Sequence, residues 1–84
     1  MIYLHKKFKK DFEKLSQREK DKFKERLHLF LIDEFDPVLN NHCLNGKYEG
    51  CKSINVSGDI RAIYETKSTD IKFVAIGNHN DLYK

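Results

Sequence analysis

Long apolar runs are missing from this sequence of 84 residues. A helix that spans a membrane needs about 20 consecutive apolar residues, and no run approaches that length. The first ten residues, MIYLHKKFKK, also contain too short an apolar stretch for a secretory signal peptide. These absences argue against a membrane protein, and we expect the chain to be cytoplasmic with no membrane partner.

Cysteine is scarce as well, with Cys43 and Cys51 as the only two. Two cysteines are too few for a disulfide scaffold, and in a reducing compartment we expect free thiols. A zinc site needs four ligands, and these cysteines together with His42 and His79 do not have a zinc-finger spacing. We therefore expect no metal and no other cofactor.

Repeats, low-complexity tracts and linkers are also missing, so residues 1–84 are expected to form one domain. Its positive charge is concentrated near the start. Residues 1–28 contain ten Lys and Arg against five Asp and Glu, whereas residues 29–84 contain six against eight. A basic segment suggests a polyanionic partner, such as nucleic acid or an acidic protein. A lysine-rich helix face in solvent explains the same charges, and charge alone favours that explanation.

The amino-terminal part of the sequence predicts an amphipathic helix. In KKFKKDFEKL, Phe8, Phe12 and Leu15 recur at the spacing of one helix face. Ser16, followed three residues later by Glu19, is a capping box that opens a second helix.

The second helix should continue through KDKFKERLHLFLIDEF, and Asp36 with Pro37 marks its end. The side chains predicted for its buried side are Phe23, Leu27, Phe30, Leu31 and Phe35. Two helices that are apolar on one side only make a helical hairpin, which must cover another layer.

The remaining sequence is typical of β-strands. IYL near the start, and later CKSINV, DIRAIYE and IKFVAIG, are strand candidates, and the turn sequences SGD and KSTD separate the last three. We therefore predict an α+β fold with the helical hairpin on one face of a small, antiparallel-rich twisted sheet. The long loop DPVLNNHCLNGKYEG is of a kind that often carries function.

The register of the first long hairpin follows from its turn. A two-residue turn would mix apolar and polar side chains on both faces of the hairpin, whereas a three-residue turn over residues 57–59 separates them. The pairs predicted by that turn are Val56–Ile60, Ile54–Ala62 and Asn55–Arg61. One face then becomes a core face, and the other is polar and cationic with Asp59 at its rim.

Arg61 is the cation best placed for chemistry, because it lies within a strand. A guanidinium presents paired donors to phosphate oxygens. An ion pair of Arg61 with Asp59 or Glu65 is an equally good explanation.

Two of the four histidines lie away from the lysine-rich helical region, His42 in the long loop and His79 in the tail GNHNDLYK. They can act as acid and base because imidazole titrates near neutral pH, although each is also explained as an ordinary polar residue. Tyr83 either plugs the end of the core or stacks on an unpaired base. We expect Gly77 to let the chain leave its strand and Leu82 to anchor the tail.

Three motifs occur in order after the basic FKKDFEKL helix. They are H.L.G...G at 42–50, GD.R.IY at 58–64 and G.H..LY at 77–83. With these motifs and elements, nearly the whole chain resembles the RelE/YafQ family of bacterial toxin endoribonucleases, which have a RelE/ParE-like fold. The YafQ branch is the more similar, because its members carry loop and tail histidines where RelE uses lysines and arginines.

The resemblance implies a toxin that cleaves mRNA on the ribosome and that a cognate antitoxin neutralises. Cleavage would be a metal-free attack of an RNA 2′-OH on the neighbouring phosphate. By the resemblance, His79 is the general acid and Asp59 or His42 the base, while Arg61 stabilises the phosphoryl oxygens. The implied partners are therefore the antitoxin, the ribosome and mRNA.

The resemblance also assigns Lys52, Asn55 and Tyr83 to RNA binding. Asn55 departs from the YafQ pattern, which has a histidine there, and an asparagine cannot transfer protons near neutral pH. Two alternatives therefore stay open. One is a ParE-like gyrase inhibitor, although such proteins do not need the pair His42 and His79. The other is a catalytically degenerate toxin that only binds antitoxin and RNA or the ribosome.

Overall fold

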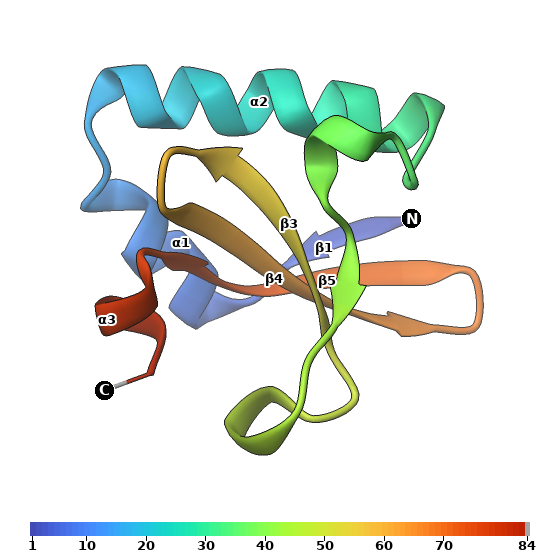
Figure 1. Ribbon diagram of the computed structural model, residues 1–84. Coiled ribbons are helices and arrows are strands. Elements are labelled where there is room, and N and C mark those ends of the chain that lie inside the picture. The colour runs from blue at the N-terminus through green and yellow to red at the C-terminus, as the bar shows by residue number, and fades with distance from the viewer. Residues whose placement is uncertain (84) are drawn as a thin grey trace.

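The computed structural model describes residues 1–83, and within them it confirms the α+β prediction (Figure 1). The strands are β1 (Ile2–Leu4), β2 (His42–Cys43), β3 (Lys52–Ser57), β4 (Ile60–Lys67) and β5 (Asp70–Gly77). The α-helices are α1 (Lys6–Glu13), α2 (Gln17–Ile32) and α3 (His79–Leu82). Two 3-10 turns, η1 (Pro37–Leu39) and η2 (Gly46–Tyr48), lie between α2 and β3.

The five strands form one sheet in the order β1-β5-β4-β3-β2. β1 runs parallel to β5, and all other neighbours are antiparallel. Figure 1 shows α2 lying across one face of this sheet, whereas α3 and the loop with η2 lie below it. Within residues 1–83, no helix is long and apolar enough to cross a membrane.

Helix α2 begins as predicted but ends earlier. The Ser16 hydroxyl accepts a hydrogen bond from the Glu19 N–H (3.2 Å), and the Glu19 carboxylate accepts one from the Ser16 N–H (2.9 Å). The capping box is therefore confirmed. The helix ends at Ile32 instead of Asp36, because Asp33 takes an extended backbone conformation (φ −153°, ψ 98°). Asp36 instead caps η1 by accepting from the Val38 N–H at 2.9 Å.

The predicted buried side of α2 is confirmed in its first part. Phe23 and Phe30 are 4% and 3% exposed, and Leu27 packs beside them. The prediction is wrong for Leu31 and Phe35, which are 61% and 66% exposed. One residue turns a helix by about 100°, so Leu31 projects away from the stripe of Phe30, and Phe35 follows the end of the helix.

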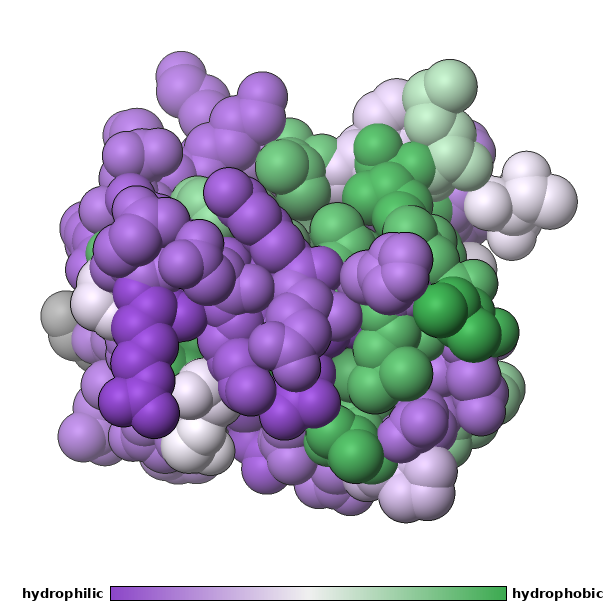
Figure 2. All heavy atoms as spheres, turned by 90° about the horizontal axis from the view of Figure 1, so that it is seen from above, coloured by the Kyte–Doolittle hydropathy of each residue, from purple (hydrophilic) through white to green (hydrophobic). Residues whose placement is uncertain are grey.

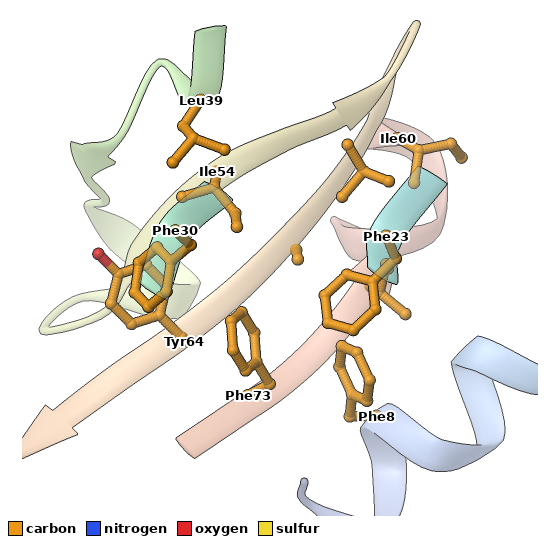
Figure 3. Close-up of a cluster of buried hydrophobic side chains, with 11 residues drawn as sticks. Phe8, Phe23, Phe30, Leu39, Ile54, Ile60, Tyr64 and Phe73 are labelled. Carbon is orange, nitrogen blue, oxygen red and sulfur yellow. The ribbon is translucent and has the colours of Figure 1, made fainter. Parts of the chain in front are cut away.

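Five aromatic rings form the centre of the core between the helices and the sheet, the helix-side core (Figure 3). They belong to Phe8, Phe23, Phe30, Tyr64 and Phe73, and their contacting centroids lie 5.0 to 6.0 Å apart. The Tyr64 hydroxyl donates to Asn41 Oδ1 at 3.0 Å. Burial raises the pKa of Tyr64, so its phenol stays neutral at physiological pH.

The β3–β4 hairpin has the predicted core face but a different turn. The pairs Ile54–Ala62 and Asn55–Arg61 are confirmed. The pair Val56–Ile60 is wrong, because Ser57 pairs with Ile60 across a two-residue turn and a bulge lies between residues 55 and 57. The bulge absorbs the extra residue and keeps Val56 fully buried in the helix-side core.

The face of the sheet away from α1 and α2 carries an apolar cluster at its centre. The prediction that this face is polar is therefore wrong for the centre of the face. This site-side cluster contains buried Ile63, Ala75 and Leu82 with partly buried Leu44, Tyr48, Cys51 and Val74. Both cysteines are free thiols, as predicted. Burial, together with the Glu65 carboxylate, raises the pKa of Cys51, so its thiol stays protonated near neutral pH.

Candidate active site

A cavity of about 270 Å³, the site cavity, opens on the site side of the sheet. Its walls come from segments far apart in the sequence, namely β2 and the loop after it, β3, β4 and the tail with α3. The lining residues are His42, Leu44, Ser53, Arg61, Ile63, His79, Leu82 and Tyr83. Four of the seven residues predicted for the site therefore meet in one cavity.

Arg61 forms the cationic wall of this cavity. It is the second residue of the central strand β4, paired with Asn55 on β3 and with Gly77 at the end of β5, and is half-buried. Its Nη1 donates to the Ser53 hydroxyl at 3.4 Å. No carboxylate of residues 1–83 forms an ion pair with Arg61, so neither predicted ion pair, with Asp59 or with Glu65, is present. The guanidinium keeps donors available for an anion.

The ring of His42 is oriented by a backbone contact. Its Nδ1 lies 2.8 Å from the carbonyl oxygen of Asn40, which has a left-handed backbone conformation (φ 44°). A carbonyl can only accept, so the contact requires the hydrogen of neutral imidazole on Nδ1 and leaves Nε2 unprotonated. His42 is therefore arranged to take up a proton at Nε2.

The tail brings His79 and Tyr83 together on α3. The Asn78 side chain caps this helix by accepting from the Asp81 N–H at 2.8 Å. The rings of His79 and Tyr83 lie 4.7 Å apart between centroids, with 32° between their planes. Leu82 is 2% exposed and anchors the tail, as predicted.

Gly77 is required for space rather than for an unusual backbone angle. A Cβ placed on Gly77 would lie 3.1 Å from the Cβ of Asp81, closer than most real contacts. A side chain at residue 77 would therefore force Asp81, in the first turn of α3, to shift by a few tenths of an ångström.

The other three predicted site residues do not line the site cavity. Asn55 is half-buried on the same face of the sheet as Arg61, its pairing partner, but its side chain is not part of the cavity lining. Asp59 is exposed in the hairpin turn. Lys52 pairs with Tyr64 of the helix-side core, and side chains alternate along a strand, so Lys52 lies on the opposite face from Ser53.

Sequence reasoning did not assign a role to Ser53, Leu44 or Ile63, which complete the lining. Strand alternation predicts Ser53 on the face of Arg61, two residues before Asn55, but does not give it a role. Ser53 is 1% exposed, and its hydroxyl is the partner that orients the guanidinium.

The arrangement is suited to acid–base chemistry on an anion. Two imidazoles and one guanidinium surround a small cavity, and an aromatic ring stands at its edge. Within residues 1–83, no three His, Cys, Asp or Glu side chains are grouped so that they could hold a metal ion.

Comparisons with known proteins identify the family. A family model described as the bacterial toxin of type II toxin–antitoxin system, YafQ, matches residues 1–84. YafQ from E. coli strain BL21(DE3) is similar in structure, with a TM-score of 0.85, 23% identity and coverage of 100% of this chain and 98% of that one. No curated protein sequence matches significantly.

Two solved complexes contain similar chains. The E. coli DinJ-YafQ toxin-antitoxin complex matches with a TM-score of 0.81, 24% identity and coverage of 100% of this chain and 97% of that one. The YoeB-YefM complex from Staphylococcus aureus matches with a TM-score of 0.74, 16% identity and coverage of 94% and 95%. These similarities confirm the predicted RelE-like toxin fold. Because the family model spans its whole length, the chain belongs to the YafQ family of bacterial toxins of type II toxin–antitoxin systems.

Proposed function

We propose that this toxin is a ribosome-dependent endoribonuclease that cleaves mRNA without a metal ion. The observation that carries the proposal is the site cavity, in which His42, Arg61 and His79 meet from three separate parts of the chain. Acid–base cleavage of RNA needs a base, an acid and a cation in one place, and these residue types supply all three.

In the proposed reaction, the RNA 2′-oxygen attacks the adjacent phosphorus while the bond from phosphorus to the 5′-oxygen breaks. In its neutral form, His42 takes the proton of the 2′-OH at Nε2, because the contact with the Asn40 carbonyl places the single ring hydrogen on Nδ1. His79, in its protonated form, gives a proton to the leaving 5′-oxygen. The products are a 2′,3′-cyclic phosphate and a 5′-hydroxyl.

Arg61 would stabilise the negative charge that develops on the phosphoryl oxygens. Tyr83, which is 38% exposed, would stack on a base next to the scissile bond. Asn55 would hydrogen-bond a neighbouring phosphate. Asp59 lies outside the cavity, so we assign the general base to His42 rather than to Asp59. Lys52 would then contact RNA only beyond the site cavity.

The macromolecular partners follow from this chemistry. The ten basic side chains of residues 1–28 suit ribosomal RNA, and binding should weaken as salt increases. Ribosomes and mRNA place the toxin in the cytoplasm.

We also propose that an antitoxin covers the apolar surface beside α2, because the similar YafQ and YoeB chains were solved in complexes with DinJ and YefM. A groove of about 470 Å³, with further apolar walls from β1 and α1, runs along the part of α2 between Phe23 and Leu27. Figure 2 shows apolar side chains gathered over the carboxyl end of α2. The large exposed ones are Leu31, Ile32, Phe35 and Val38.

A translation-coupled cleavage assay with the purified protein tests the enzymatic proposal. Ordered breaks in translated message, with 2′,3′-cyclic phosphate ends, are the expected result. Loss of DNA supercoiling activity in a gyrase assay, with intact message, would instead support ParE-like action. Inactivity in both assays would support the degenerate toxin, the alternative that the asparagine at position 55 favours.

Binding of the antitoxin is tested separately. Leu31→Asp with Phe35→Asp should leave the toxin folded, since both side chains are exposed, and should weaken binding to its co-expressed antitoxin by at least tenfold in calorimetry. Unchanged affinity would remove the carboxyl end of α2 from the interface.

A further inference from the structure

Helix α3 needs support from outside itself. It has four residues, His79–Leu82, and helices shorter than about 12 residues are marginal in water. Nevertheless it carries His79 and is followed directly by Tyr83, and both rings border the site cavity. The geometry of the proposed reaction therefore depends on whatever fixes this short helix.

Two side chains from η2 hold the carboxyl end of α3. Lys47 Nζ and the Tyr48 hydroxyl each donate a hydrogen bond of 3.0 Å to the carbonyl oxygen of Leu82. Carbonyls in the last turn of a helix lack partners within the helix. A cation is also favoured there by the helix dipole. The two donors thus satisfy an acceptor that the four-residue helix leaves open.

Tyr48 also contacts the tail through its ring. Its centroid lies 5.5 Å from that of Tyr83 in an edge-on arrangement (84°), and Tyr83 in turn lies against His79. The Tyr48 side chain packs in the site-side cluster beside Leu82. Burial raises the pKa of Tyr48, so its hydroxyl keeps the hydrogen that it donates. An unbroken series of contacts therefore runs from Tyr48 to the imidazole of His79.

The loop around η2 is shaped to present these two residues. Gly46 and Gly50 flank the pair with φ of +67° and +89°, backbone angles that glycine adopts without strain. The Cys51 N–H donates to the Tyr48 carbonyl at 2.9 Å and closes the loop. The glycines of the H.L.G...G motif thus have a structural purpose in the loop.

We propose that Lys47 and Tyr48 are positioning residues, which hold α3 so that His79 and Tyr83 face the site cavity. Neither residue lines the cavity. They act on the reaction only through the Leu82 carbonyl and the ring of Tyr83. The effect on cleavage rests on the proposed function, whereas the effect on α3 does not.

The test is the double variant Lys47→Met, Tyr48→Phe, which removes both donors but keeps the apolar stems and the ring. In hydrogen-exchange NMR, the Leu82 and Tyr83 amides, which bond to Asn78 and His79, should exchange about tenfold faster than in wild type. The imidazole resonances of His79 should shift as the ring of Tyr83 moves. In the cleavage assay, kcat should fall about tenfold with KM within about threefold of wild type.

Two comparisons isolate the positioning role. The first is the double variant Lys47→Arg, Tyr48→Phe, which keeps a charged donor at position 47. It should retain part of the hydrogen-exchange protection and part of the kcat that Lys47→Met, Tyr48→Phe loses. Lys67→Met removes an exposed lysine at the far end of β4 and should change neither measurement.

Wild-type exchange at Leu82 and Tyr83 in the double variant would overturn the proposal, and so would faster exchange with an unchanged kcat. If wild-type protein itself fails to cleave message, the proposed function fails. Exchange and the His79 resonances then decide on their own whether Lys47 and Tyr48 hold α3.

Discussion

The two faces of the sheet are built differently. The helix-side core joins α1 and α2 to the sheet through eleven buried residues, and it has interlocking aromatic rings (Figure 3). The site-side cluster has three buried residues, and the elements over it are a four-residue helix and a loop with one 3-10 turn. Stability should therefore reside mainly on one face and chemistry on the other.

The difference also explains how each face is held. The stabilisation from apolar burial is non-directional and roughly proportional to the apolar area removed from water. The proposed catalysis needs side chains in fixed places, and on the site side hydrogen bonds orient them. Examples are the contacts of Arg61 with Ser53, of His42 with Asn40 and of Tyr48 with Leu82.

The largest effect is expected from Phe73→Ala on the helix side. Phe73 is fully buried and touches three Phe rings and Tyr64. Its loss should lower the free energy of unfolding by about 3–5 kcal/mol, enough to leave much of a small domain unfolded. Urea denaturation measures this change in the free energy of unfolding. Phe35→Ala, at an exposed position, is the matched control and should change stability by less than about 0.5 kcal/mol. A mild effect of Phe73→Ala would contradict the division between the faces.

His79→Ala should give the opposite pattern, a loss of activity without a loss of fold. If His79 transfers a proton, cleavage of translated mRNA should slow by roughly 10² to 10⁴. The ring is exposed, so the urea midpoint should stay close to wild type. His28→Ala, an exposed histidine on α2, controls for loss of an imidazole. Wild-type cleavage by folded His79→Ala would remove His79 from the mechanism.

The division between faces also separates what could be predicted from the sequence. Periodicity and the capping box predicted α1, the start of α2 and the strand pair Asn55–Arg61, because local patterns determine these features. The exposure of Phe35 was not predictable in this way, since helix periodicity does not say that α2 ends at Ile32. The bulge in β3 reflects the fit of the whole hairpin.

For the site, residue types indicated His42, Arg61 and His79, which do meet in the cavity. The position of Asp59 outside it could not be read from sequence distance, because a residue two positions from Arg61 can still lie in a turn that projects into solvent. Contacts between a side chain and the backbone of a residue far along the chain, such as those of Lys47 and Tyr48 with Leu82, leave no local sequence pattern, unlike the capping box of Ser16 and Glu19.

A smaller effect is expected from Ser16→Ala at the start of α2. The change removes the acceptor for the Glu19 N–H, and loss of such a cap costs about 1 kcal/mol. Since α2 covers only the helix side, the urea midpoint should fall while the cleavage rate of the folded protein is kept. Ser16→Asp supplies another capping oxygen and should restore stability. A Ser16→Ala protein with normal stability but slow cleavage would mean that α2 is coupled to the site.

The smallest effect is a pH dependence on the helix side. Burial raises the pKa of Tyr64 above its ordinary value of 10.0, so the folded state favours the neutral phenol. This contribution to stability is fully present below pH 10.0 and is lost as pH rises through the folded pKa. Tyr64→Phe loses the hydrogen bond to Asn41, which costs about 1 kcal/mol at pH 7.

Above pH 10.0 the Tyr64 phenol of wild type ionises more readily in the unfolded state than in the folded state, and this lowers the stability of wild type. Tyr64→Phe has no phenol at this position and is not affected. The stability difference between the two proteins should therefore shrink as pH increases. Urea titrations from pH 7 to about pH 11 measure it, with Tyr3→Phe, an exposed tyrosine on β1, as the control. A difference that stays constant across this range would show that burial of Tyr64 does not favour its neutral form, and hence that the helix-side core does not shield this phenol from water.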